Sequence, residues 1–416
     1  MSQDIHITDL AHPQLSAVQQ AALDYGNTVQ VDFSERGVLA AARERTGLAD
    51  FGADDFRERL NLLLDEWGND DNMTALQRAN LFGYLVRYAS NRLLIQDFWR
   101  HHPEALEKPV CRPIIVAGLP RSGTTHLLNL LAADTRFRSL PLWESYEPLP
   151  LPGEHASDDA SDPRYQRCEA QWQGMQQTTP LLAAMHPMNP EHIHEELELM
   201  GPAFASYNFE WLAPSPRWRD HYYASDQRPH YAYMRDVLKL LQWRRGPERW
   251  VLKCPQHLEQ LPVLHETFPD ATIVITHRDP VAVIQSAVTM IAYGQRMGRK
   301  RIDLPALVDY WSDRVEHLLR ACVADRPQLP EAQSIDVPFH EFMADDMAMV
   351  ERIYATAGTP LDARAREQMQ AFLADHPRGK EGRVIYRLKE DFGVDPAALR
   401  ERFAFYFERS PVRAEV

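Results

Sequence analysis

A glycine loop between an apolar run and a leucine-rich segment constrains the fold of this chain most strongly. The run IIVAG (114–118) is short, apolar and β-branched, which is typical of a buried parallel strand. The loop GLPRSG follows it, and the leucines of THLLNLLA (125–132) then recur at helical spacing. A strand, a glycine loop and a helix in this order form a concave anion site from backbone N–H groups. The alternative is a turn in which the glycines only permit a tight bend.

The loop lacks the lysine of a nucleoside triphosphate site. Gly118 and Gly123 have the spacing of the pattern G-x-x-x-x-G-K-[ST], but Thr124 stands where the lysine belongs. Without that lysine, a triphosphate loses its contact to the β- and γ-phosphates. A ligand with a single 5′-phosphoryl group that carries a transferable group has no β- or γ-phosphate, so it loses no contact through the missing lysine.

The remaining side chains of the loop favour binding of an oxyanion. Ser122, Thr124 and Thr125 supply hydroxyl donors beside the backbone of Gly123, and the Arg121 guanidinium can bind two oxygens at once. The residues therefore predict an adenylyl sulfate as the ligand.

Further strands and helices alternate downstream of the loop. RWVLK (249–253) and ATIVITH (271–277) are strand-like, and VAVIQSAVTMIA (281–292) is helix-like. Alternating strands and helices indicate an α/β fold with a parallel sheet.

The rest of the chain is predicted to be largely helical. We expect a helical N-terminal segment (1–108) that packs on an α/β domain (109–416), and a helical insertion at about 165–245. The insertion is rich in aromatic residues between 200 and 235, and these residues with the N-terminal helices are predicted to build a hydrophobic acceptor cavity.

Composition excludes several classes of protein. A net charge of −14 argues against a general nucleic-acid binder. The four cysteines are widely spaced, as expected of free thiols in a reducing compartment. The first residues lack the features of a signal peptide, and no apolar run reaches the roughly 18 residues of a membrane helix. We therefore expect a cytoplasmic protein without a transmembrane segment.

A second anion-binding element is predicted after the strand at 271–277. Arg278 ends this strand, and Ser286 lies about two turns into the next helix. An arginine at this position lies at the edge of the sheet where open α/β folds bind ligands. The alternative is that Arg278 pairs with Asp279 or another nearby acid.

The motifs together resemble the family of sulfotransferases that use 3′-phosphoadenosine-5′-phosphosulfate (PAPS), in particular its bacterial branch with the loop P-R-[ST]-G-T-T. The resemblance runs from about residue 50 to 409. The matching segments, in family order, are PIIVAGLPRSGTTHLLNLLA, LPLWESYEPLP, YMRDVLKLLQWRR, WVLKCPQHLEQLPVLHETFPDATIVITHRDP and YRLKEDFGV.

The resemblance implies a P-loop-like fold and a ligand. It implies PAPS as the sulfuryl donor, 3′,5′-ADP as the product, and a small or lipid-like hydroxylated acceptor. The loop, including Arg121, would hold the 5′-phosphosulfate, and Arg278 with Ser286 would hold the 3′-phosphate. The sequence leaves a homo-oligomer open.

Two regions depart from the pattern of the cytosolic animal sulfotransferases. His126 stands where those proteins have an adenine-stacking tryptophan, so it either stacks on adenine or packs in its helix. The basic stretch PRGKEGR (377–383) resembles their loop over the 3′-phosphate, although the spacing differs. Arg378 and Lys380 are therefore expected to contact the nucleotide, with a solvated turn as the alternative.

The resemblance also implies the catalytic groups. Arg121 and Lys253 would stabilise the charge on the transferring group, without a metal; the alternative for Lys253 is an exposed strand end. Glu144 lies 23 residues after Arg121, where tyrosylprotein sulfotransferases place a catalytic glutamate. Burial beside aromatic residues is expected to raise its pKa and make it the base. His257 is the rival base; a structural arginine pair for Glu144 and a packing role for His257 are the alternatives.

The stretch EHIHEELELM (191–200) contains candidate metal ligands, namely His192, His194 and either Glu195 or Glu196. On a helix, two histidines at this spacing point about 200° apart. We therefore expect no metal here, and interpret the segment as a helix or a wall of the acceptor pocket.

Two other functions compete with sulfuryl transfer. A phosphotransferase that uses ATP and Mg²⁺ would need the missing lysine at position 124. A non-catalytic nucleotide-binding protein would retain the fold without turnover.

Overall fold

A five-stranded parallel sheet lies at the centre of the molecule. The computed structural model describes residues 4–247, 249–377, 380 and 382–416. The strands follow the order β3-β4-β2-β5-β6, and every neighbouring pair is parallel. Their bounds are β2 Ile114–Gly118, β3 Phe137–Arg138, β4 Arg249–Lys253, β5 Thr272–His277 and β6 Ser334–Pro338. The predicted strands are thus present, and β2, which leads into the glycine loop, is the central strand.

Alternation along the strands divides the core into two layers. In β2, Ile115 and Ala117 belong to one hydrophobic cluster, whereas Ile114 and Val116 belong to another. Successive side chains of a strand point to opposite faces, so apolar runs such as IIVAG require helices on both faces of the sheet. The P-loop-like α/β fold predicted from the sequence is therefore confirmed.

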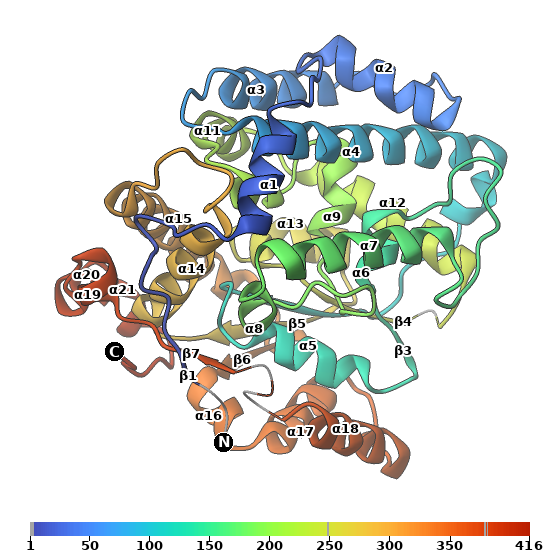
Figure 1. Cartoon of the computed structure of the whole chain (residues 1–416). Helices are drawn as coiled ribbons and strands as arrows, with labels where there is room; N and C mark the ends of the chain where they lie inside the picture. The colour runs from blue at the N-terminus through green and yellow to red at the C-terminus, as the bar shows by residue number, and fades with distance from the viewer. Residues whose placement is uncertain (1–3, 248, 378–379, 381) are drawn as a thin grey trace.

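Helices cover both faces of the sheet (Figure 1). One face packs mainly against α12–α15, and the other against α5 and α16–α18. The bounds of these helices are α5 Thr124–Ala132, α12 Arg228–Arg244, α13 Leu261–Thr267, α14 Pro280–Gly294, α15 Leu304–Asp325, α16 Phe339–Ala344, α17 Asp346–Thr356 and α18 Ala363–Asp375.

Of the N-terminal helices, α2–α4 lie at the top of Figure 1, and α1 runs from there toward the middle of the molecule. Their bounds are α1 Ala17–Gly26, α2 Glu35–Thr46, α3 Phe56–Gly68 and α4 Ala75–His101. Residues of α2–α4 share one hydrophobic cluster with Phe204, Phe209 and Trp218 of the insertion. The N-terminal segment therefore packs on the insertion; the domain boundary at residue 108 stays a prediction.

Short helices make up most of the insertion and of the C-terminal region. They are α6 Leu142–Tyr146, α7 Pro163–Thr178, α8 Leu182–Met185, α9 Leu197–Met200, α10 Asn208–Leu212, α11 Pro216–Ala224, α19 Leu388–Phe392, α20 Pro396–Arg402 and α21 Ala404–Phe407. Short 3₁₀ turns are η1 Pro103–Leu106, η2 Gly201–Ala203, η3 Pro255–Glu259, η4 Arg326–Gln328 and η5 Glu331–Gln333. A small parallel pair, β1 Asp4–Ile5 with β7 Arg383–Val384, joins the two ends of the chain. In the described part of the chain, no helix combines the length and the apolar character needed to cross a membrane.

Candidate functional site

The glycine loop between β2 and α5 has the backbone of an anion site. Gly123 has φ 81° and is the N-cap of α5, and Arg121 has φ 65°. Positive φ at a non-glycine residue such as Arg121 is strained and persists only where the surroundings hold it. The Ser122 hydroxyl donates to the carbonyl of Leu119 at 2.5 Å and contacts Thr276 Oγ1 at 2.8 Å. The loop is therefore fixed to β5 and presents its N–H groups at the start of α5.

The second predicted anion element lies directly beside this loop. The Arg121 Nε donates to Ser286 Oγ at 3.0 Å, and Arg278 Nη1 donates to the backbone carbonyl of Arg121 at 2.5 Å. These contacts follow from the topology, because β2 and β5 are neighbours and both end at the same edge of the sheet. Arg121, Arg278 and Ser286, which come from two motifs distant in the sequence, thus lie together. Their two arginines make this the cationic group of the site.

Arg278 is also held by an acid that the sequence reasoning did not identify. Its guanidinium binds both carboxylate oxygens of Glu415, at distances from 2.7 to 3.1 Å. It lies 4.0 Å from the centre of the Phe339 ring. The alternative interpretation, pairing with Asp279 or another nearby acid, thus holds in this structure for Glu415, whereas Asp279 caps α14 by accepting from the N–H of Val281. The forked contact shows that Arg278 is oriented to bind two oxygens of an anion.

Lys253 extends the cationic group onto β4. The lysine is buried, so the alternative of an exposed strand end is wrong. Its ammonium group binds the Glu195 carboxylate and lies 3.4 Å from Thr125 Oγ1 of the loop. A buried ammonium without a paired acid would be costly, and Glu195 provides that acid.

A second acid supports Lys253 through its backbone. The N–H of Lys253 donates to Glu196 at 2.9 Å, and the other oxygen of Glu196 binds His257 Nε2 at 2.7 Å. His257 Nδ1 contacts the Tyr231 hydroxyl at 2.9 Å, so both ring nitrogens have partners. The sequence analysis considered Glu195 and Glu196 only as possible metal ligands, so their contacts with Lys253 and His257 were missed.

Comparison with models of protein families identifies the family to which this chain belongs. The model described as "Sulfotransferase family" matches residues 113–363. This chain belongs to the sulfotransferase family. A comparison with curated proteins gave no match.

Two solved structures from mycobacteria are similar to this sulfotransferase. Sulfotransferase STF1 from Mycobacterium tuberculosis H37Rv is 30% identical with a TM-score of 0.78, and the match covers 89% of this chain and 98% of that one. Sulfotransferase STF9 from Mycobacterium avium is 26% identical with a TM-score of 0.83, and the match covers 93% and 100% of the two chains.

Glu144 lies in a different environment from the one expected for this sulfotransferase. It is buried, and its carboxylate binds Arg138 at 2.5 Å and Arg245 at 3.1 Å. Burial alone would raise the pKa of Glu144, but the two guanidinium groups outweigh burial and lower it. The expectation of a raised pKa is therefore wrong, because two cations stabilise the carboxylate.

Glu144 lies near the start of β4, whereas Lys253 lies at the end of that strand. The Glu144 partner Arg138 pairs with Trp250 in the sheet, and Arg245 precedes β4, whereas Lys253 is the last residue of that strand. Both partners therefore lie near the start of β4, Arg138 on the neighbouring strand β3 and Arg245 before β4. The role of Glu144 as the base stays a prediction.

The residues predicted around the adenine and the 3′-phosphate are only partly described. His126 Nε2 contacts Asp346 at 3.1 Å, and its ring centre lies 5.5 Å from that of Phe342. Lys380 is exposed, with its ammonium 3.4 Å from the carbonyl of Asp375. Arg378 lies outside the described residues. Contact of His126, Arg378 and Lys380 with a nucleotide stays a prediction.

A cavity of about 850 Å³ opens between the N-terminal helices and the sheet domain. Its lining includes Tyr84 of α4, Met175 of α7, His186, Trp211 and Met290 of α14. The N-terminal helices thus contribute to it as expected.

The aromatic residues of 200–235 contribute less to the cavity than expected. Phe204, Phe209, Trp218 and Tyr222 are buried in the core shared with α2–α4, and Trp211 is the aromatic residue of this stretch that lines the cavity. Packing against the N-terminal helices uses the other rings, so the prediction is wrong for most of them.

The cavity lies beside the cationic group. His186 lines the cavity, and the Arg121 guanidinium donates to the backbone carbonyl of Met185, the preceding residue. Burial lowers the pKa of His186, and the positive charges of Lys253 and Arg121 lower it further. A molecule bound in the cavity would therefore lie near the loop.

Proposed function

We propose that this sulfotransferase transfers the sulfuryl group of PAPS to a hydroxyl group of a small apolar or lipid-like acceptor and releases 3′,5′-ADP. One observation carries the proposal. The loop arginine Arg121 contacts Ser286 and accepts a hydrogen bond from Arg278 through its backbone. The two anion elements are thus close enough to hold opposite ends of one adenosine bisphosphate.

The residues fit the two anionic ends of the donor. The backbone N–H groups at 122–125 and the Thr125 hydroxyl would face the 5′-phosphosulfate at the start of α5. Arg278 already holds a carboxylate in forked geometry, so the same guanidinium suits a phosphate. The 3′-phosphate would replace Glu415 on that guanidinium.

When bound, PAPS supplies the sulfuryl group: a bond forms between the acceptor oxygen and sulfur, the bond from sulfur to the bridging phosphate oxygen breaks, and the hydroxyl proton leaves to a base. Lys253 and Arg121 would stabilise the negative charge on the bridging and equatorial oxygens. The ion pair with Glu195 fixes the ammonium of Lys253 beside Thr125, so this charge needs no reorganisation during the reaction.

The cavity indicates the class of acceptor. A volume of about 850 Å³ accommodates a molecule larger than a simple phenol. Its apolar lining also contains Arg45, Arg87, Arg167 and Arg299, each of which is paired with an acid. This lining suits a hydrophobic alcohol or phenol.

The test is direct transfer of labelled sulfate. The protein is incubated with [³⁵S]PAPS and a panel of phenols, sterols, long-chain alcohols and sugars, and labelled products are separated from free PAPS. We expect acceptor-dependent label on at least one hydrophobic hydroxyl compound and none on the sugars. Absence of label on every acceptor, together with normal 3′,5′-ADP binding, would favour the non-catalytic alternative.

A further inference from the structure

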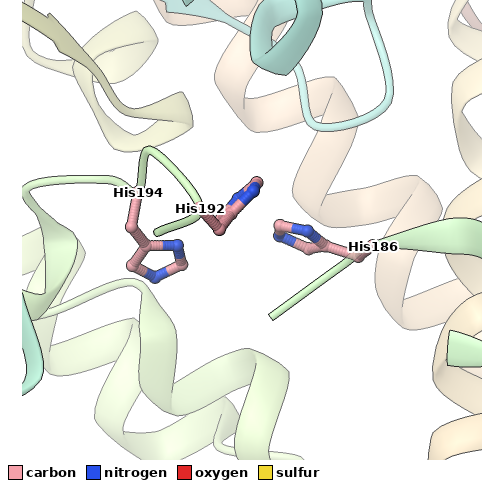
Figure 2. A group of neighbouring side chains, drawn as sticks. All are labelled: His186, His192 and His194. Atoms are coloured by element: carbon pink, nitrogen blue, oxygen red, sulfur yellow. The ribbon is translucent and has the colours of Figure 1, made fainter. Parts of the chain in front are cut away.

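Three histidines that the proposed reaction does not use lie together beside the cavity. His186 follows α8, and His192 and His194 lie in the extended segment before α9. One ring nitrogen of each lies within 4.8 Å of one in each of the others. Figure 2 shows the three imidazole rings gathered around a common point, approached from two segments of the chain.

The local backbone explains why this group was not expected from the H-x-H spacing. Residues 191–196 are not helical: Ile193 forms an antiparallel bridge with Pro141, and the helix begins only at Leu197. In extended chain, residues two apart point to the same side, whereas on a helix they diverge. The assumption of a helix for the H-x-H motif was wrong, and the spacing instead brings His192 and His194 together.

Hydrogen bonds on both sides fix this segment. The N–H of His194 donates to the carbonyl of Leu140 at 2.7 Å, and the N–H of Leu142 donates to the carbonyl of His192 at 2.8 Å. The N–H of His186 donates to the carbonyl of Leu182 at 2.7 Å. The three imidazoles are therefore held by the backbone before any ligand binds.

One nitrogen of the group is left without a partner. His194 is 6% exposed, and its Nδ1 is buried without a hydrogen-bond partner in the described structure. A buried polar atom in this state costs free energy that a ligand can recover. The other nitrogen, Nε2, lies 4.0 Å from Glu198 Oε1. The Glu198 carboxylate thus lies on the Nε2 side of the ring, beyond hydrogen-bond distance, and Nδ1 is the nitrogen left for a ligand.

We propose that His186, His192 and His194 bind one divalent transition-metal ion of the zinc class, with a fourth position open to the cavity. Three imidazoles are a common ligand set for zinc with an exchangeable site. Tetrahedral zinc with bonds of about 2.0 Å needs nitrogens about 3.3 Å apart, so the rings, whose nitrogens lie within 4.8 Å of one another, would move closer on binding. His186 lines the cavity, so an oxygen of a bound acceptor can fill the fourth position.

The surrounding charges permit such a site. Lys253 and Arg121 lie near the histidines, but the Lys253 ammonium is paired with Glu195. Glu198, behind His194, is paired with Arg87 at 3.0 Å. Glu195 and Glu198 thus each offset a cation, whereas the described contacts of Arg121 are to Ser286, the carbonyl of Met185 and Tyr386, so its charge opposes the ion.

The test is metal binding by the full-length protein without a histidine tag, after treatment with a chelator and its removal. Zn²⁺ is titrated by calorimetry, and Co²⁺ is titrated by visible absorption, where a tetrahedral site gives intense bands. We expect one equivalent of Zn²⁺ with a Kd on the order of 1 µM or tighter. The variants His192→Ala and His194→Gln should each weaken binding at least about a hundred-fold.

Matched variants keep the result interpretable. His101→Gln removes a histidine that is 68% exposed on α4 and should bind Zn²⁺ like the wild type. His186→Ala, at the half-buried edge of the group, serves if the deeper variants fail to fold. Absence of stoichiometric binding to the wild type, or binding unchanged by loss of His186 and His192, overturns the proposal. The assay uses neither PAPS nor turnover, so its failure is distinct from failure of the proposed function.

Discussion

Lys253 is the residue whose charge the proposed chemistry depends on most directly. We expect the double variant Lys253→Met with Glu195→Gln to lower kcat by roughly a hundred- to a thousand-fold, because it removes a cation from the transferring group. Replacing both partners avoids a buried, unpaired charge, so the protein should still fold.

The readouts for this variant are kcat by labelled transfer and the Kd for 3′,5′-ADP by calorimetry. Binding of the product nucleotide should change little, since Lys253 would act on the sulfuryl group. A kcat within three-fold of the wild type would show that the lysine is structural.

For Glu144, the sequence and the structure favour different roles: the sequence predicts a catalytic base, and the contacts of the side chain favour a structural role. A catalytic base would lose at least about a hundred-fold in kcat on substitution, with normal stability. The two arginine pairs and the lowered pKa instead favour a structural role. We expect Glu144→Gln to lower the Tm and to keep kcat within ten-fold, whereas His257→Asn, which loosens Glu196 beside Lys253, should lower kcat more. The reverse order of the two kcat values would restore Glu144 as the base.

The C-terminal tail contacts Arg278, one of the residues proposed to bind the 3′-phosphate. Glu415 binds Arg278 and must leave before a 3′-phosphate can take its place. We expect Glu415→Gln to tighten 3′,5′-ADP binding by up to about five-fold, because a partly exposed ion pair contributes up to roughly 1 kcal/mol. The measurement is calorimetric, with Glu408→Gln as the control. Weaker binding in the Glu415 variant would mean that the tail supports the nucleotide.

Local patterns were sufficient to predict the elements that carry the anion site. The apolar run of β2, the glycines and the leucines of α5 are contiguous, and Arg278 ends a strand of the same sheet. Parallel strands place their carboxyl ends at one edge, so adjacency of the two motifs followed from topology.

Long-range pairs were the part that the sequence did not reveal. Glu195 lies 58 residues before Lys253, and Glu415 lies 137 residues after Arg278, and neither pair has a local spacing rule. The histidine group was missed for a related reason. Whether 191–196 is extended or helical depends on its bridge to Pro141, which is a tertiary contact.

At the scale of the whole molecule, the N-terminal segment and the insertion are joined by buried polar contacts. Arg59 of α3 donates to the carbonyl of Ala203 at 2.9 Å, and Arg92 of α4 donates to the carbonyl of Pro202 at 3.3 Å. His230 of α12 is buried near these arginines. Burial and the charge of Arg59 lower its pKa to about 4.

Because of His230, we expect the folding stability of the protein to depend on pH. The unfolded chain binds a proton at His230 below a pKa of about 6.5, but the folded chain does so only below about 4, so stability falls as the pH falls through this window. We expect the wild type to lose roughly 2 kcal/mol more than His230→Gln between pH 7 and pH 5. Urea unfolding at both pH values measures this difference. An equal loss in both proteins would contradict a buried neutral ring at position 230.

We propose that the loop at 118–125 and Arg278 hold one nucleotide between them, and calorimetric titration with 3′,5′-ADP measures this binding directly. We expect saturable binding to the wild type. The affinity of Arg278→Ala for 3′,5′-ADP should be roughly ten- to a hundred-fold weaker, because charge-assisted hydrogen bonds are lost. We also expect unchanged affinity in Arg36→Ala, whose arginine side chain is 89% exposed on α2, and no comparable binding of ATP with Mg²⁺. No heat with 3′,5′-ADP, or full affinity without Arg278, would contradict the proposal.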